Sequence, residues 1–219
     1  MALDTVCDFE TDDSLTIYYA DIPPYDSGWA IGHNAYNDIA WAERYTVTGS
    51  ANVVGGVYML YENSGSATSG GTANAHVYST TGTNGKPGTS LGSVAIPFAS
   101  MTNLTDGSGH LFSFTAPVAV TNAFYMGFAL GTYTLTGPDT IAVITSKHGN
   151  RSTTNNDQNC VQWSDSKWYF EATENFKLKV NYGLCAIIDV VGGVENYVSK
   201  GDLNVYAAYP NPSAKEVTL

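Results

Sequence analysis

Charged residues are scarce in this chain of 219 residues, and basic residues are the scarcest of them. Only 13% of the residues are charged, and 9 basic against 20 acidic side chains give a net charge of -11. Nucleic acids and anionic membrane surfaces both require a basic patch, so the composition argues against both as partners. It is compatible with calcium and with uncharged polymers such as glycans.

Long apolar runs are also missing. No stretch of about 18 apolar residues occurs, so the sequence predicts no transmembrane helix and no membrane insertion. Residues 1–4 lack the basic region and following apolar region of a signal peptide. If the protein is exported, we expect its signal peptide to have been removed.

Cysteine is limited to Cys7, Cys160 and Cys185. An oxidising compartment would permit one disulfide and leave one thiol over. Cys7 lies in the first predicted strand and Cys185 just after the last, and the first and last strands of a sandwich are often neighbours. We therefore expect a Cys7–Cys185 disulfide. No Cys-x-x-Cys pair or histidine cluster accompanies the cysteines, so zinc is not expected.

Tyrosine and glycine are abundant, with 15 and 22 residues respectively, and this mix favours strands and tight turns over helices. Alternating segments separated by turn-forming residues predict strands at 6–10, 15–19, 39–47, 53–61, 72–80, 91–96, 110–115, 123–130, 140–145, 160–163, 167–170 and 176–182. The expected fold is all-β, an antiparallel two-sheet β-sandwich of jelly-roll type. An Ala-rich helix over residues 38–44 is the alternative at that position.

Three regions are expected along the chain: the β-sandwich at 1–185, a linker at 186–203 and the start of a further domain at 204–219. In the last region Pro210 and Pro212 fix two φ angles and remove two backbone donors. Such a stop blocks pairing with a neighbouring sheet, which is typical of a domain boundary.

The tail has a specific resemblance. Tyr209-Pro210-Asn211-Pro212-Ser213, followed by Val217-Thr218-Leu219, resembles the opening of the type A C-terminal sorting domain of type IX secretion, the Por system. The resemblance covers residues 204–219 only. It implies a secreted or outer-cell-surface protein of a Gram-negative bacterium that engages the type IX machinery through this tail. It does not indicate the ligand.

Two motifs in the body carry a looser resemblance. They are the segment Gly28-Trp29-Ala30-Ile31-Gly32-His33-Asn34-Ala35-Tyr36-Asn37-Asp38 and the turn Gly85-Lys86-Pro87-Gly88. Both resemble bacterial surface β-sandwich modules that precede type IX sorting domains. The resemblance spans residues 5–183 and implies a fold and a location but no activity.

Signatures of catalysis are weak, and no catalytic residue is predicted. Gly-x-Ser-x-Gly is absent from the sequence. The histidines, which fall on different expected elements, are His33, His76, His110 and His148. Glycosidic cleavage needs two carboxylates in a cleft, and no spacing selects a pair. The carboxylates that could supply one are Glu10, Asp38, Glu43, Asp157 and Glu171.

A structural calcium ion is the one cofactor that the sequence permits. Calcium takes 6–8 oxygen ligands from carboxylates, amides and carbonyls. Carboxylates concentrate near the first strand, and Asn34 with Asp38 forms a second cluster. The predicted ligands are Asp8, Glu10 and Asp38, and the alternative is a solvated acidic turn.

Aromatic side chains beside Asn-rich loops give the strongest functional indication. Flat Tyr and Trp faces stack on sugar rings, while amides and carboxylates recognise the hydroxyls. Trp41 and Trp168 lie on alternating strands and are expected to pack inside. The predicted ligand-binding residues are Trp29, His33, Asn34, Tyr36, Asn156, Asp157 and Trp163.

These features favour a non-catalytic carbohydrate-binding module of a secreted or cell-surface multimodular protein. The alternative is a structural or adhesive spacer module that binds protein ahead of the sorting domain. A hydrolase is the least favoured class.

Overall fold

The computed structural model describes residues 3–10, 13–20, 28–64, 71–101, 109–131, 140–149 and 159–190. Within these residues the regular elements are β-strands and two short 3-10 helices, with no α-helix. The strands are β1 (Leu3–Val6), β2 (Leu15–Thr16), β3 (Tyr19–Ala20), β4 (Gly28–Trp29), β5 (Ala40–Tyr58), β6 (Leu60–Ser64), β7 (Thr72–Tyr78), β8 (Ser90–Pro97), β9 (His110–Ala129), β10 (Thr140–Val143), β11 (Thr145–Ser146), β12 (Cys160–Gln162), β13 (Trp168–Phe170) and β14 (Leu184–Val190). The 3-10 helices are η1 (Thr83–Gly85) and η2 (Phe98–Ser100).

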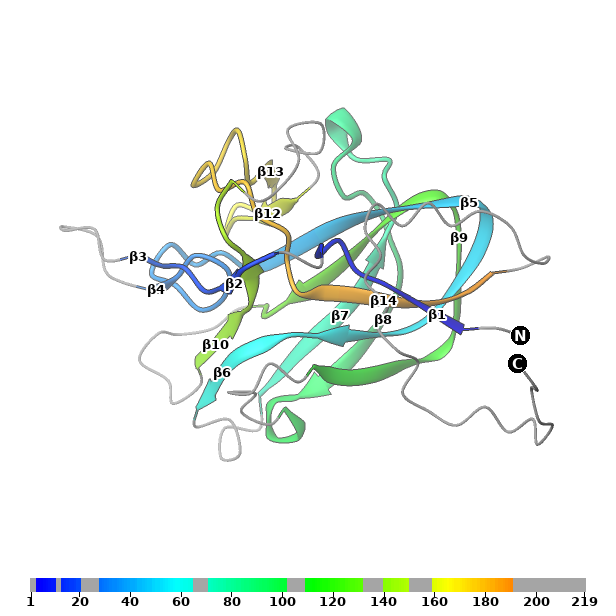
Figure 1. The fold of residues 1–219 in the computed structure, drawn as a ribbon, viewed down its shortest axis with the longest axis horizontal. Helices are drawn as coiled ribbons and strands as arrows, with labels where there is room; N and C mark the ends of the chain where they lie inside the picture. The colour runs from blue at the N-terminus through cyan, green and yellow to red at the C-terminus, as the bar shows by residue number, and fades with distance from the viewer. Residues whose placement is uncertain are drawn as a thin grey trace, which may run out of the picture.

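One eight-stranded sheet organises the molecule (Figure 1). Its strand order is β1-β14-β5-β9-β7-β8. In addition, β12 pairs with the first residues of β5 on one side and with β13 on the other. Two-stranded sheets are formed by β10 with β6, β11 with β2 and β3 with β4. All these pairings are antiparallel, which confirms the all-β, antiparallel fold class predicted from the sequence.

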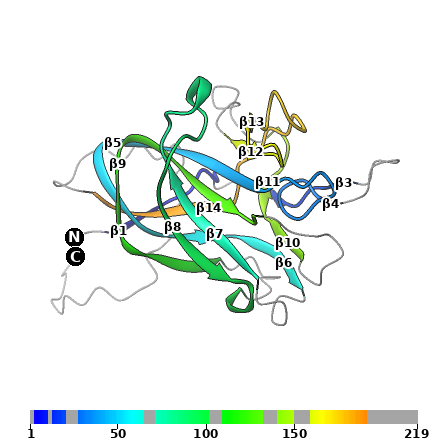
Figure 2. The same cartoon turned by 180° about the vertical axis from the view of Figure 1, so that it is seen from behind.

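The two longest strands, β5 and β9, pair with each other from Ala40 opposite Ala129 to Tyr58 opposite His110. Each joins two segments that the sequence predicted as separate strands, and the helix considered for residues 38–44 is wrong. The register shifts between Thr46 and Ser50, where extra residues bend a strand pair. Figures 1 and 2 show both strands curving at this end, so that the sheet curls around its core.

Side chains from opposite walls of this curl meet in the core. The hydroxyl of Tyr45 in β5 donates to the carbonyl of Leu184 in β14 at 3.1 Å. Tyr58, near the other end of β5, donates to the carbonyl of Gly127 in β9. Both tyrosines are buried. Each hydroxyl has a partner, as a buried polar group requires, so the core is filled and internally bonded.

A second, smaller cluster lies on the outer face of the same sheet. It contains Ala42, Tyr78, Tyr125 and Cys160, with Trp168 and Phe170 packed against it. Gly127 makes room for Tyr78, since a Cβ at Gly127 would lie 2.4 Å from the tyrosine ring. The β12–β13 hairpin therefore covers the sheet here, and β5 begins buried on both faces.

Residues 176–182 do not form the strand that their alternation predicts. Lys177 adopts a φ of 60°, which interrupts extended backbone. Three backbone N–H groups donate to side chains instead of a strand partner: Lys179 to His148, Asn181 to Ser146 and Tyr182 to Glu43. The inward alternation still holds in part, because Val180 and Tyr182 are buried.

The expected linker begins at residue 186, but β14 continues to Val190. Ala186 pairs with Val6 on one side and Gly56 on the other, so the first residues of the expected linker belong to the sheet. The strand continues past residue 185 because alternate side chains, Ala186 and Ile188, are buried in the core. The rest of the linker and the tail at 204–219 lie outside the described residues.

The β1–β14 pairing brings Cys7 beside Cys185, and the two form a disulfide with a Cα–Cα distance of 4.6 Å. This is the pair expected from the sequence. The bond joins the first and last described strands across 178 residues of chain. Cys160 remains a free, buried thiol.

Reducing this disulfide should lower the free energy of unfolding by about 5 kcal/mol, because a cross-link over 178 residues restricts the unfolded chain strongly. Thermal melts with and without reductant measure the effect. The variant Cys7→Ser should melt at the lower temperature under both conditions. Cys160→Ala is the matched control and should keep the full response to reductant. Identical wild-type melts in both buffers would contradict the prediction.

Candidate functional site

Asn34 folds the segment between β4 and β5 into a compact turn. Its Nδ2 donates to the Trp29 carbonyl at 3.1 Å and to Asp38 Oδ2 at 3.0 Å, and its Oδ1 accepts from the Asp38 N–H at 3.2 Å. Gly32, with a φ of 147°, packs against the Ile141 carbonyl so closely that a Cβ would lie 2.1 Å from it. The Gly and Asn residues of this motif therefore serve its local fold.

His33 and Asn34 do not reach the surface, although both were predicted to bind a ligand. Their exposed fractions are 3% and 1%. Nδ1 of His33 accepts the Ile141 N–H at 2.9 Å. Polar groups this deeply buried need partners inside the protein, so both side chains are committed to the turn. A role for these two residues in ligand binding stays a prediction.

Trp29 belongs to a cluster of three rings from β3, β4 and β6. It meets Tyr19 edge-on with ring centroids 4.9 Å apart, and Tyr61 in the same manner at 5.9 Å. Tyr19 and Tyr61 are exposed, at 56% and 42%. Trp29 is thus a partly exposed aromatic residue, with neighbours that the sequence analysis did not assign to it.

The β12–β13 hairpin carries a stacked aromatic pair. The rings of Trp163 and Tyr169 lie 3.8 Å apart between centroids, at an angle of 24°. Because Val161 pairs with Tyr169 in this hairpin, Trp163 is the diagonal neighbour of Tyr169 on the same face. Both are partly exposed. Trp168, which precedes Tyr169, is also partly exposed, but it packs against the outer cluster and meets Tyr78 edge-on.

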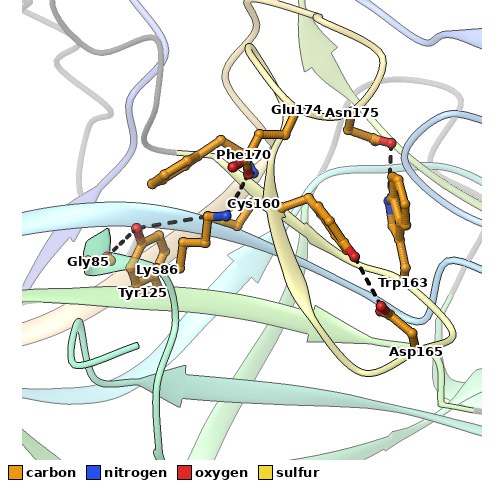
Figure 3. Close-up of polar contacts among 10 residues, drawn as sticks. Gly85, Lys86, Tyr125, Cys160, Trp163, Asp165, Phe170, Glu174 and Asn175 are labelled. Carbon is orange, nitrogen blue, oxygen red and sulfur yellow. Dashed lines mark hydrogen bonds and ion pairs between the residues drawn. The ribbon is translucent and has the colours of Figure 1, made fainter. Parts of the chain in front are cut away.

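Asp165 holds the tip of this hairpin. Its Oδ1 accepts the Lys167 N–H at 2.9 Å, and its Oδ2 accepts the Tyr169 hydroxyl at 3.0 Å (Figure 3). The hydrogen bond from the Lys167 backbone holds the pKa of Asp165 below its usual value. An ionised carboxylate therefore lies at the edge of the Trp163–Tyr169 stack.

The loop after β13 extends the aromatic surface. Trp163 Nε1 donates to Asn175 Oδ1 at 3.2 Å (Figure 3), and the adjacent Phe176 meets Tyr36 edge-on at 5.5 Å. All four rings are partly exposed. We call Tyr36, Trp163, Tyr169 and Phe176 the hairpin platform. Two predicted ligand-binding residues, Tyr36 and Trp163, contact adjacent residues of this loop, whereas Trp29 contacts a different set of rings.

Lys86 ties the turn after η1 to the base of the hairpin (Figure 3). Its Nζ lies 2.6 Å from Glu174 Oε2 and 4.8 Å from the centre of the Phe170 ring. The same Glu174 oxygen accepts the Phe170 N–H at 2.7 Å. Lys86 is buried, whereas the side chain of Glu174 is 38% exposed, so the ion pair joins the buried base of the hairpin to its surface.

Among the described residues, three carboxyl side chains are buried: Asp38, Glu43 and Glu171, each at most 2% exposed. Glu43 accepts the Tyr182 N–H at 2.8 Å, and the Tyr182 hydroxyl donates to Glu171 Oε2 at 3.2 Å. Burial raises the pKa of Asp38 to about 6 and that of Glu171 to about 7. All three carboxyl groups accept hydrogen bonds inside the protein.

The histidines occupy separate elements. His76 in β7 stacks on Tyr78 and lies 3.0 Å from the hydroxyl of Ser90 in β8. Nδ1 of His148 accepts a backbone N–H, as that of His33 does. The His76–Ser90 pair joins side chains on two adjacent strands, where it links β7 to β8.

The predicted calcium ligands lie in different surroundings. Asp38 is buried against Asn34, Asp8 is half-buried and Glu10 is exposed. Within the part of the chain that the structure describes, no group of three or more His, Cys, Asp or Glu side chains is arranged to hold a metal ion. A calcium site involving these residues stays a prediction and would need amide and carbonyl oxygens as further ligands.

Two predicted ligand-binding residues, Asn156 and Asp157, lie outside the described residues. Sequence reasoning missed Tyr169, Asn175 and Phe176 as parts of the site. The sequence could have indicated Tyr169, because side chains alternate between the two faces of a hairpin and its short turn places Tyr169 diagonally opposite Trp163. The contacts of Asn175 and Phe176 depend on an irregular loop, for which the sequence holds no comparable periodicity.

No protein-family model and no curated protein matches this chain. Among the described residues, no helix has the length and apolar character needed to cross a membrane.

The protein should lose stability as the pH rises from 5 to 8. Burial raises the native-state pKa of Glu171 from 4.5 to about 7, so the native state binds a proton that the unfolded state has released. The raised pKa of Asp38 acts in the same direction. A shift of this size corresponds to roughly 3 kcal/mol for Glu171 by pH 8. Urea unfolding at several pH values measures it.

Glu171→Gln should flatten this pH dependence, because glutamine keeps the shape and carries no titrating group. Glu10→Gln is the matched control at an exposed position and should keep the wild-type slope. If Glu171→Gln and wild type lose stability in parallel between pH 5 and 8, the buried carboxyl is not the cause.

Proposed function

We propose that this protein is a non-catalytic carbohydrate-binding module of a secreted or cell-surface protein, and that the hairpin platform is its glycan-binding surface. The observation that carries the proposal is the partly exposed stack of Trp163 on Tyr169. A sugar ring has a face rich in C–H groups, which packs on a flat aromatic ring, and a rim of hydroxyls that needs polar partners. The stack has such a partner at its edge in Asp165, which accepts the Tyr169 hydroxyl.

The charges around the platform favour a neutral glycan over an acidic one. Asp165 carries negative charge at the edge of the stack, and Lys86 is neutralised by Glu174. The chain as a whole has a net charge of -11. Uronic or sulfated polysaccharides would be repelled by this field, whereas neutral polysaccharides would not.

Further parts of the proposal rest on the sequence alone. We infer a two-sheet sandwich of jelly-roll type, whose loops rather than an interior pocket carry the site. The resemblance of residues 204–219 to a sorting domain supports export by the type IX machinery, and the acidic segments support a structural calcium ion.

Trp163→Ala should weaken binding to a neutral polysaccharide at least tenfold, since it removes one ring of the stack and exposes the edge of the other; tenfold corresponds to about 1.4 kcal/mol. Affinity electrophoresis against a panel of neutral and acidic polysaccharides identifies the ligand, and calorimetry with its oligosaccharides measures the affinity.

Trp168→Ala is the matched control, because Trp168 comes from the same hairpin but packs on Tyr78 in the outer cluster. It should lower stability and leave binding within about twofold of wild type, a difference of about 0.4 kcal/mol. No retardation of the wild-type protein by any polysaccharide would overturn the proposal and leave the spacer or adhesive module as the better reading. Loss of binding in Trp168→Ala alone would move the site to the outer cluster.

A further inference from the structure

A single side chain, Asn175, connects the platform to the enclosed carboxyl of Glu171. Trp163 Nε1 donates to Asn175 Oδ1 at 3.2 Å, and Asn175 Nδ2 donates to Glu171 Oε2 at 2.8 Å. Figure 3 shows Asn175 directed at the indole of Trp163. The partly exposed ring and the buried acid are thus two hydrogen bonds apart.

The chemistry of the three groups allows only one arrangement. An indole N–H is only a donor, Glu171 Oε2 accepts from two neighbours, and an amide has one donor end and one acceptor end. The acceptor at Glu171 therefore requires Asn175 to direct its NH₂ group inward. The Asn175 oxygen then faces the indole of Trp163 and accepts its N–H. If Asn175 turned over, both contacts would bring like groups together.

Glu171 is itself firmly held. Its Oε2 also accepts the Tyr182 hydroxyl at 3.2 Å, and its backbone N–H donates to the Asn159 carbonyl at 2.9 Å. The backbone N–H of Asn175 donates to the Phe170 carbonyl at 3.1 Å, which fixes the backbone position from which the Asn175 side chain extends. Other titratable groups around this carboxyl are Asp38, which acts on it electrostatically, and Glu43, which accepts the Tyr182 N–H.

We propose that Glu171 is a positioning residue, which acts through Asn175 to set the orientation of the Trp163 indole on the platform. Without its oxygen the amide is free to turn, the indole N–H loses its acceptor, and stacking on Tyr169 alone holds the ring. The orientation of the ring is independent of any ligand. Only the consequence for glycan binding rests on the proposed function.

Hydrogen exchange of the indole N–H, followed by NMR on the full chain without ligand, tests the proposal. The Trp163 resonance is assigned as the signal that disappears in Trp163→Phe. The indole N–H of Trp41, which donates to the Ala30 carbonyl, is the internal reference. In Glu171→Leu, exchange at Trp163 should accelerate at least tenfold relative to that reference. Glu171→Gln should restore it to within about twofold of wild type, because its amide oxygen accepts the same two hydrogen bonds.

Asn175→Ala provides a second route if Glu171→Leu fails to fold. It leaves Glu171 in place, removes the link and should accelerate exchange to the same extent. Unchanged exchange in Glu171→Leu or Asn175→Ala overturns the proposal. Equal acceleration in the Leu and Gln variants also overturns it, because that result indicates general loosening of the loop. If these exchange results hold and no polysaccharide binds the wild type, the proposed function fails while the positioning role stands.

Discussion

The pairing of β5 with β9 is the interaction on which the rest of this structure depends. Two strands of 19 and 20 residues stay paired through a bend, and their register shifts between Thr46 and Ser50 and again between Val53 and Gly55. Three further strands use an edge that this pair provides: β14 and β12 pair with β5, and β7 pairs with β9. Because the pair curls, the inner faces of its two halves meet, and Tyr45 and Tyr58 reach across the space between them.

The platform follows from the hairpin that β5 anchors. β12 pairs with the first residues of β5, so alternate residues of the hairpin must face opposite ways. One set, with Trp168 and Phe170, closes the outer cluster over Ala42 and Gly127, where small residues leave room for rings. The other set, Trp163 and Tyr169, has no place in that cluster and stacks at the surface. Trp163 and Tyr169 therefore stack on one face of the hairpin while its other face packs on the outer cluster.

The loop after β13 replaces ladder hydrogen bonds with side-chain acceptors, and this substitution brings acidic groups into the protein. Glu43 lies on the inward face of β5, where its carboxylate receives a backbone N–H that a neighbouring strand would otherwise bind. Glu171 orders Asn175 and, through it, the indole. Burying carboxyl groups is unfavourable when they are ionised, which is why the pKa values of Asp38 and Glu171 rise. The irregular loop and the pH dependence therefore have one origin.

The sequence alone determined the fold class, most strand positions and the β12–β13 hairpin, because alternation and turn residues are local properties of the chain. It also paired Cys7 with Cys185 through the expected closeness of the first and last strands. Local patterns were misleading where contacts with distant segments decide the structure. Residues 176–182 alternate like a strand, yet this segment is irregular. His33 and Asn34 are polar like residues of a surface loop, yet both are buried.

Only the tertiary structure decided which aromatic rings meet. Tyr36 and Trp163 are 127 positions apart and contact adjacent residues, while Trp29, closer to Tyr36 in sequence, joins a different cluster. The bend in β5 and β9 and the irregular loop after β13 set these distances. Both depend on contacts between segments far apart in the chain, which local periodicity does not encode. The composition therefore established that aromatic side chains are abundant, and the packing of the sheet selected the few that face the solvent together.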